Sequence, residues 1–267
     1  MRPVDDPAEI LAIYQRAPHV HPYGIADVVQ LWPTSTWWRR GDAVVGLLDL
    51  PGGDVVYSVT ADPSARPATL ELLADLAAPA RGDLPDAFTI TGPTGLTAAL
   101  EGAGYTARWA DAYDKLHLPP DAPLPDPPDD LVVLDRADVP AMTALFATDP
   151  DAGDFFHAGL VDTGFYLGRR EGRSPDGVLV AVAGVHVVEP GTGVAAIGNV
   201  ATHPSHRRRG HGRAVVVGLV HRLREVADVI GLNVRHRTAP ARALYRDLGF
   251  LHATTYEEAA VVRGSPR

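Results

Sequence analysis

The segment from His206 to Arg213 is the part of the chain best suited to bind an anion. It reads His-Arg-Arg-Arg-Gly-His-Gly-Arg, so two glycines stand among a group of arginines. A glycine costs roughly 0.5–1 kcal/mol relative to alanine inside a helix, and its usual benefit is that backbone can approach a ligand closely. The first N–H groups of a helix lack internal partners and carry the positive end of its dipole. A glycine-lined helix start beside arginines therefore predicts a site for phosphate or pyrophosphate.

The elements on either side of this segment must hold it in place. An apolar run at residues 194–201 comes before it and predicts a strand. The stretch from 207 to 226 predicts a helix whose buried face carries Val216, Leu219, Val220, Leu223 and Ala227. The order is strand, tight loop and helix, and the glycine spacing matches neither the Rossmann fingerprint nor a Walker A loop.

A second block further along the chain carries a candidate acid. An apolar run at residues 229–234 predicts a strand, and the segment 238–250 predicts a helix after it. Pro240 suits the start of that helix, where its missing N–H does no harm, and Gly249 suits its end. Tyr245 lies on this helix. A phenol with an ordinary pKa of about 10 is neutral at neutral pH and can donate a proton.

Together the two blocks resemble the GCN5-related N-acetyltransferases (GNATs). The pattern Arg207-x-x-Gly210-x-Gly212, after a strand that ends Asn-Val-Ala-Thr-His-Pro, is similar to motif A of that family, which holds the pyrophosphate of acetyl-coenzyme A. The helix that carries a tyrosine and ends in Leu-Gly-Phe is similar to the second block of the family. The resemblance covers about residues 131–262. It implies an α+β fold, a mostly antiparallel mixed sheet flanked by helices, with the pantetheine arm between two splayed strands.

The resemblance also implies which residues bind acetyl-CoA. Free N–H groups at Val200 or Thr202 would bind the thioester carbonyl and then its oxyanion. Backbone N–H groups of the glycine loop would carry most of the pyrophosphate recognition. Asn233 either caps a strand end or contacts the pantetheine arm, and both readings stay open. The acetyl-CoA-binding residues implied in this way are Val200, Ala201, Thr202, Arg207, Arg208, Arg209, Gly210, His211, Gly212, Arg213, Asn233 and Ala241.

The catalytic residues follow less directly. By position Tyr245 matches the family tyrosine that protonates the coenzyme A thiolate as it leaves, and the alternative is a core aromatic. Asn199 lies where many relatives place a glutamate base, and an amide cannot take up the proton. His186 is the best replacement because the pKa of an imidazole suits neutral pH, although a hydrogen-bonded core histidine is the alternative. Weaker candidates for the base are His157, Glu257 and Glu258.

Several histidines raise the question of a metal centre. His203, His206 and His211 lie close together in the sequence, and His19 and His21 come earlier. His203 and His206 straddle a turn, and no acidic or cysteine partner stands at ligand spacing. We therefore predict that the protein binds no metal.

Composition excludes several classes of protein. The chain has 267 residues, of which 46% are hydrophobic, so it can form one large domain or two small ones. It has no cysteine, which excludes disulfides, thiolate metal sites and a cysteine nucleophile. A net charge of -9 does not suit nucleic acid or an anionic membrane. No apolar run approaches the roughly 20 residues of a membrane helix, and the start lacks a signal-peptide profile, so we expect a cytoplasmic protein.

A segment rich in proline and aspartate divides the chain. Residues 119–130 predict a semi-rigid linker, because this composition opposes both helix and sheet. The first domain is then expected at residues 1–118 and the second at residues 131–267.

The two halves repeat each other in order. Residues 98–105 lie over residues 243–250, including the Gly-Tyr and Gly-Phe ends. The first half lacks a Gly-x-Gly loop, since its segment 62–69 reads Asp-Pro-Ser-Ala-Arg-Pro-Ala-Thr, and Leu100 stands where the second half has Tyr245. We therefore expect two tandem GNAT-like domains, of which the first is degenerate and binds no acyl-CoA.

The remaining elements are predicted from the hydrophobic pattern. Helices are expected at residues 8–17, 68–78, 95–104, 139–147 and 155–161. Strands are expected at residues 37–40, 43–50, 55–60, 88–91, 131–134, 165–169 and 178–188, with one or two more before residue 262.

These observations predict an enzyme that moves an acetyl group from acetyl-CoA to a primary amine of a small-molecule acceptor by direct attack. The sequence does not name the acceptor, and the oligomeric state stays open. One alternative is a non-catalytic acyl-CoA-binding or sensing protein. Another is transfer of a different acyl group, or transfer to a hydroxyl.

Overall fold

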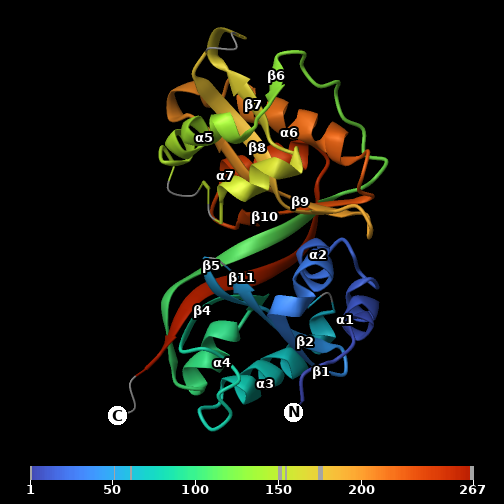
Figure 1. The fold of residues 1–267 in the computed structure, drawn as a ribbon, viewed down its shortest axis with the longest axis vertical. Helices are drawn as coiled ribbons and strands as arrows, with labels where there is room; N and C mark the ends of the chain where they lie inside the picture. The colour runs from blue at the N-terminus through green and yellow to red at the C-terminus, as the bar shows by residue number, and fades with distance from the viewer. Residues whose placement is uncertain are drawn as a thin grey trace. The chain divides into compact units, whose positions relative to one another are not determined.

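The chain forms two compact units, which do not follow a single cut in the sequence. The computed structural model describes residues 2–50, 52–60, 62–149, 152–153, 155–173 and 177–264 (Figure 1). Unit 1 comprises Met1–Leu116, Val234–Ala239 and His252–Arg267, and unit 2 comprises His117–Asn233 and Pro240–Leu251. The expected division placed everything after residue 131 in the second domain, whereas the last strand of the chain belongs to unit 1.

Unit 1 is a sheet covered by four helices. The helices are α1 (Pro7–Tyr14), α2 (Pro22–Leu31), α3 (Arg66–Ala77) and α4 (Leu96–Gly102), and short 3₁₀ turns lie at Trp32–Thr34 and Pro63–Ala65. The strands are β1 (Ser35–Arg40), β2 (Ala43–Leu50), β3 (Gly53–Tyr57), β4 (Ala87–Pro93), β5 (Tyr105–Leu118) and β11 (Leu251–Arg263). Their order is β1-β2-β3-β4-β11-β5.

The C-terminal strand β11 lies inside this sheet, between β4 and β5. It pairs antiparallel with β4 from Tyr256 opposite Pro93 to Val262 opposite Ala87. The sequence correctly predicted a final strand, but that strand completes the sheet of the first half of the chain. Unit 1 is therefore built from segments that lie at opposite ends of the sequence.

Two elements of unit 1 were missed by the sequence analysis. Helix α2 begins at Pro22 without a side-chain cap, so no start signal marks it. Strand β5 buries the consecutive residues Asp114 and Lys115, and this breaks the alternation of polar and apolar residues by which a strand is recognised.

Lys115, the only lysine of the chain, is fully buried in unit 1. Its Nζ lies 4.6 Å from the ring centroid of Tyr23 and 5.2 Å from that of Tyr256. Burial lowers the pKa of Lys115 to about 7, and the nearby carboxyl groups of Asp27 and Glu258 oppose this shift. Burial also raises the pKa of Asp27 to about 7, against the effect of Lys115. Two aromatic rings and two carboxyl groups thus surround one buried cation.

We expect Lys115→Met to destabilise the protein by about 3–5 kcal/mol near pH 7, where Lys115 and Asp27 both carry charge, because it leaves the buried carboxyl groups without their cation. Methionine keeps the length and apolar stem of lysine, so the change in packing is small. The loss should shrink near pH 5, where Asp27, with its raised pKa, is protonated. Because the pKa of Asp27 is raised in the folded protein, protonation of Asp27 stabilises the folded state at low pH. This stabilisation is lost as the pH rises through about 7.

Urea unfolding of the Lys115→Met protein at both pH values measures this effect. The variant Lys115→Met with Asp27→Asn is the matched control and should recover part of the stability near pH 7, since one of the two buried charges is removed. An equal loss at both pH values would show that the cluster is not held by charge.

Unit 2 holds the two blocks singled out from the sequence. Its helices are α5 (Val139–Phe146), α6 (His211–Leu223) and α7 (Ala239–Asp247), and its 3₁₀ turns lie at Arg136–Asp138, Ala158–Thr163, Glu171–Arg173 and Pro204–His206. Its strands are β6 (Leu131–Val133), β7 (Leu167–Arg170), β8 (Leu179–Glu189), β9 (Val194–Thr202) and β10 (Val229–Arg235). The order is β10-β9-β8-β7-β6, with β10 and β9 parallel and the other pairs antiparallel.

Helices α5 and α6 cover opposite faces of this sheet (Figure 1). On one face, Gly218 of α6 lies against the side chain of Leu167 in β7. On the other face, the neighbouring residue Tyr166 contacts the ring of Phe156, which in turn contacts Phe146 at the end of α5. Adjacent residues of a strand point to opposite faces, so the two helices enclose the sheet between them.

Helix α6 forms although its sequence includes Val215-Val216-Val217, a run that favours strand. All three valines are buried, and so are Leu219 and Val220. The free energy gained by burying apolar residues on both sides of α6 therefore outweighs the preference of the valine run for a strand. Each of the helices in the described ranges is too short or too polar to cross a membrane.

The expected linker is held along α6. Arg224 Nη2 donates hydrogen bonds to the carbonyl oxygens of Pro119 and Ala122, at 3.5 and 2.7 Å. His221 Nε2 lies 3.0 Å from the carbonyl oxygen of Pro125. The proline-rich segment thus follows the surface of unit 2 as extended chain.

Candidate functional site

Strands β9 and β10 stop pairing part of the way along their length. Their parallel ladder runs from Val194 opposite Val229 to Ile197 opposite Leu232. β9 then continues to Thr202 and β10 to Arg235. The predicted residues Val200, Ala201, Thr202 and Asn233 all lie beyond the last pair, in the part where the two strands no longer form a ladder.

Asn199 forms a β-bulge at the start of this gap. From the pair Val182–Ala201 to the pair Gly184–Gly198, β8 advances by two residues while β9 advances by three. Asn199 takes up the extra residue in a left-handed conformation with φ 52°. Asparagine tolerates this conformation better than most side chains, and a bulge redirects the side chains next to it.

The first turn of α6 lies beside the gap and is bare. Gly210 precedes the helix with φ 81°, and no described side chain caps the helix start. A Cβ on Gly212 would lie 3.0 Å from Thr202 Oγ1 and 4.0 Å from Leu244 Cδ2. The helix start therefore lies against the end of β9 and against α7, with its N–H groups available to a ligand.

The arginines around this turn have different surroundings. Arg207 Nε donates to the carbonyl oxygen of Thr202 at 3.1 Å, and its Nη2 donates to Asp149 Oδ2 at 2.6 Å. Arg207 thus ties the loop to the end of β9. Arg208, with φ 60°, and Arg213 are exposed. The guanidinium of Arg207 holds the loop in shape, while the backbone and the exposed arginines can meet an anion.

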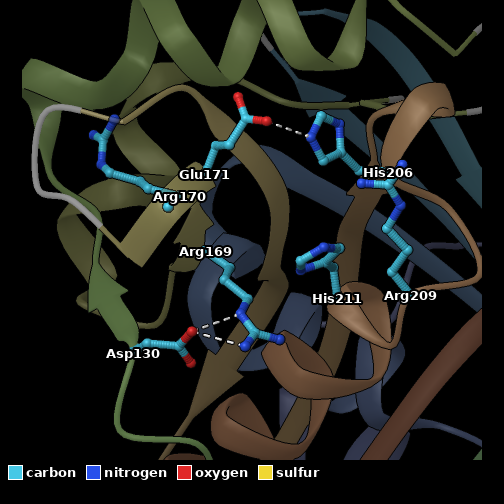
Figure 2. A pocket seen from close by; sticks show the side chains of 8 residues that line it. Asp130, Arg169, Arg170, Glu171, His206, Arg209 and His211 are labelled. Carbon is cyan, nitrogen blue, oxygen red and sulfur yellow. Dashed lines mark hydrogen bonds and ion pairs between the residues drawn. The ribbon is translucent and has the colours of Figure 1, made fainter.

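A pocket of about 400 Å³ lies on another side of the helix start (Figure 2). Its wall includes His206, Arg209 and His211, together with Asp130 and residues 169–172. Asp130 Oδ2 accepts hydrogen bonds from Nε and Nη2 of Arg169, at 2.9 and 2.7 Å. Burial and the charge of Arg169 lower the pKa of His211, so this imidazole is neutral at neutral pH. The side chains of Arg209 and His211 therefore line a separate pocket of largely compensated charges.

Two of the three histidines of this region, His203 and His206, meet around a serine. Ser205 Oγ lies 2.8 Å from His203 Nδ1 and 2.9 Å from His206 Nδ1, and His206 Nε2 lies 3.2 Å from Glu171 Oε1. Within the described residues, no group of three histidine, aspartate or glutamate side chains is placed to hold a metal ion.

Tyr245 lies on α7 next to Leu244, the residue that approaches Gly212. Its side chain is buried, and its ring lies 5.6 Å from that of Phe250. Burial raises the pKa of the Tyr245 phenol well above its usual value. The hydroxyl therefore keeps its proton throughout the physiological pH range.

The candidates for the general base lie in different parts of the structure. His186 lies on β8 against Gly198, where a Cβ would overlap its ring, so it is next to the bulge. Glu257 instead accepts hydrogen bonds from the N–H groups of Gly95 and Thr97 at the start of α4, at 2.8 and 3.4 Å. Glu258 lies in the buried cluster around Lys115. Both glutamates have structural surroundings in unit 1, which leaves His186 as the nearest candidate, with His157 at the start of a 3₁₀ turn.

The sequence analysis missed Tyr166 and Phe155. Tyr166 crosses β8 above Gly184, where a Cβ would overlap its ring, and its hydroxyl reaches Asn199. Phe155 is 55% exposed, and its ring lies 6.5 Å from that of His186. The small residue at position 184 was the only sequence signal for the first contact, and it has no meaning until the strands are aligned.

Comparison with known proteins agrees with this geometry. Residues 133–250 match the model of the Acetyltransferase (GNAT) family. They form a GNAT domain, as the sequence resemblance predicted, and a domain of this family implies acyl transfer from an acyl-CoA. A search of curated protein sequences gives no match to the chain.

Solved structures share the fold over the whole length of the chain. An X-ray structure of a Drosophila protein is 16% identical, with a TM-score of 0.72 and 99% of each chain covered. A GCN5-related N-acetyltransferase from Sphaerobacter thermophilus is 18% identical, with a TM-score of 0.58, and covers 99% of this chain and 96% of its own. A tandem GNAT protein from the clavulanic acid biosynthesis pathway is 15% identical, with a TM-score of 0.53, and covers 100% of this chain and 98% of its own. The predicted tandem GNAT fold is thus confirmed.

Proposed function

We propose that unit 2 transfers an acetyl group from acetyl-CoA to a primary amine of a small-molecule acceptor. The observation that carries this proposal is the gap between β9 and β10 beside the bare start of α6. The N–H groups of residues 207–213 would bind the pyrophosphate, and the pantetheine arm would lie along β9 toward Asn233. Ala241, in the first turn of α7, would lie beside the coenzyme.

The reaction needs few groups once the two substrates are bound together. The N–H of Val200 or Thr202 would bind the thioester oxygen and stabilise the charge that develops on it. The amine nitrogen attacks the carbonyl carbon, and the C–S bond breaks. Tyr245 would protonate the departing thiolate, and His186 is the proposed acceptor for the proton of the amine. Both substrates react directly, so no covalent intermediate with the protein is needed.

Unit 1 has the same order of elements, but its two corresponding strands, β3 and β4, stay paired where β9 and β10 separate. β3 and β4 are parallel, as β9 and β10 are, with Tyr57 opposite Thr91. The N–H of Ser58 donates a hydrogen bond to the carbonyl oxygen of Thr91 at 2.8 Å, which continues the pairing of the two strands beyond the ladder. A Cβ on Gly92 would overlap Ser58 Oγ, so the two strands lie close together there. These contacts support a single acetyl-CoA site per chain.

Gly212→Val should weaken acetyl-CoA binding by at least about tenfold, because the valine side chain would occupy the space proposed for the pyrophosphate. Calorimetric titration measures the Kd and should give one site per chain in the wild-type protein. Release of CoA thiol from acetyl-CoA in the presence of a mixture of primary amines tests the reaction itself.

Gly102→Val is the matched control, because it makes the same change in helix α4, where a Cβ meets nothing within 4 Å. It should leave the affinity unaltered. A folded Gly212→Val protein with wild-type affinity for acetyl-CoA would contradict the proposed pyrophosphate site. Binding of acetyl-CoA without any turnover would favour a sensing protein.

A further inference from the structure

Asn199 is held in one orientation by a chain of hydrogen bonds. Its Nδ2 lies 2.8 Å from Tyr166 Oη, and the Tyr166 hydroxyl lies 3.0 Å from the carbonyl oxygen of Val185. A phenol has a single proton, which it donates to Val185, so its oxygen accepts from the amide of Asn199. This contact identifies which end of the amide is nitrogen and which is oxygen.

The remaining atom of this amide, Asn199 Oδ1, is buried without a partner. Asn199 is 6% exposed, and no described residue donates a hydrogen bond to its Oδ1. Buried carbonyl oxygens nearly always accept a hydrogen bond, so an exception calls for an explanation. Rotation of the amide cannot remove the problem, because it would break the bond to Tyr166.

The position of this oxygen suggests what completes it. Gly198 directly follows the last β9–β10 pair, and Asn199 comes next. The residue after Asn199 is Val200, which is proposed to bind the thioester carbonyl. His186 and the exposed ring of Phe155 lie on the same side. A nucleophile that reaches the thioester carbon from this face comes within reach of the amide of Asn199.

We propose that Asn199 Oδ1 accepts a hydrogen bond from the N–H of the acceptor amine, and that the site thereby selects amines that arrive as the free base. This inference rests on the proposed acetyl transfer. A carboxylate at this position would attract the ammonium form, which has no lone pair for attack, whereas an amide oxygen carries no net charge. Tyr166 is the positioning residue, because it holds Nδ2 of the amide and so keeps Oδ1 turned away from its own hydroxyl.

The contact should strengthen as the reaction proceeds. When the C–N bond forms, the nitrogen becomes cationic and its N–H becomes a stronger donor to Oδ1. The electron pair of the C–S bond leaves with sulfur, which takes its proton from Tyr245. The extra proton on nitrogen leaves to His186 or solvent, so atoms and charges balance.

Asn199→Gly is the decisive variant, because glycine adopts a φ of 52° without strain and removes the amide. Aniline and benzylamine serve as a weakly and a strongly basic primary amine. The variant should lower kcat/KM for both amines by about ten- to a hundredfold, chiefly through KM, and should leave the Kd of acetyl-CoA within about twofold. Tyr166→Phe, which frees the amide to rotate, should act in the same direction with a smaller effect.

Asn199→Asp gives a readout that a purely structural role would not produce. The carboxylate should bind the ammonium form and can take up its proton, so benzylamine gains a route to its free base that aniline does not need. The ratio of kcat/KM for aniline to that for benzylamine should therefore fall by about tenfold near neutral pH. An unchanged KM and ratio in folded Asn199→Gly and Asn199→Asp proteins would overturn the role of Asn199 while acetyl transfer stands. A wild-type protein that releases no CoA thiol with either amine or with the mixed amines would overturn both.

Discussion

A chain that ends at Leu251 should fail to form unit 1. The deletion removes nearly all of β11, which lies between β4 and β5 and not at the edge of the sheet. Tyr256, Ala259 and Val261 on this strand are almost completely buried, so their loss opens the core as well as the sheet. Without β11, β4 and β5 are left as facing unpaired edges, which favour aggregation.

Side-chain contacts of β11 increase this effect. Glu257 caps the start of α4, and Arg263 donates hydrogen bonds to Asp86 Oδ1 at 2.9 Å and to the carbonyl oxygen of Ala77 at 3.1 Å. The deletion therefore removes sheet pairing, core and a helix cap together, which is more than the roughly 5–15 kcal/mol that stabilises an average domain can absorb.

Hydrogen exchange measures this result, since the amides of β4 should lose their protection in the shortened chain. Removal of residues 265–267 alone is the control and should leave protection unchanged. A peptide of residues 251–264 added to the shortened chain should restore protection by filling the open position. Normal protection in the shortened chain without the peptide would show that unit 1 closes its sheet in another way.

Tyr245→Phe should lower kcat by about 10²–10⁴-fold, the usual contribution of a general acid, with little change in the Kd of acetyl-CoA. In the proposed mechanism the hydroxyl acts when sulfur departs, so binding of acetyl-CoA should not depend on it. Because burial raises the pKa of Tyr245, the wild-type rate should show no alkaline loss due to this group at or below the usual pKa of a phenol.

Single-turnover release of CoA thiol with saturating amine measures this step. Tyr14→Phe is the matched control, because it removes another buried tyrosine hydroxyl, in unit 1, to which the described residues give no hydrogen-bond partner. It should leave kcat unaltered. A Tyr245→Phe protein with wild-type kcat would leave Tyr245 as a packed aromatic of α7.

Local features were predicted well from the sequence. The strand–loop–helix around Gly210 was found because glycines at a helix start have a direct conformational meaning, and α7 was found from Pro240 and Gly249. The long helix was expected from residue 207, but α6 begins at His211, because Pro204 to Gly210 form a 3₁₀ turn and a left-handed cap. Signals of this kind act over a few residues and survive without knowledge of the fold.

Features that depend on distant partners were not predicted. The place of β11 follows from pairing with β4, more than 160 residues earlier, and pattern along the strand cannot specify that partner. The contacts of the Arg207 guanidinium with Asp149 and with the carbonyl oxygen of Thr202 also join segments that the sequence does not pair. The contact between Asn199 and Tyr166 likewise exists only because Gly184 lets a tyrosine cross β8.

The burial of Lys115 has a consequence for the chemistry of the protein as a whole. The proposed acetylation of amines could in principle modify lysines of the enzyme itself, and reagents that acylate amines would report such sites. Here the only lysine of the sequence is fully enclosed. The folded protein is therefore a poor acceptor for acetyl groups, and CoA thiol released from acetyl-CoA in an assay reports reaction with the added amine or with water. Amine-reactive labels should reach Lys115 only after the chain unfolds.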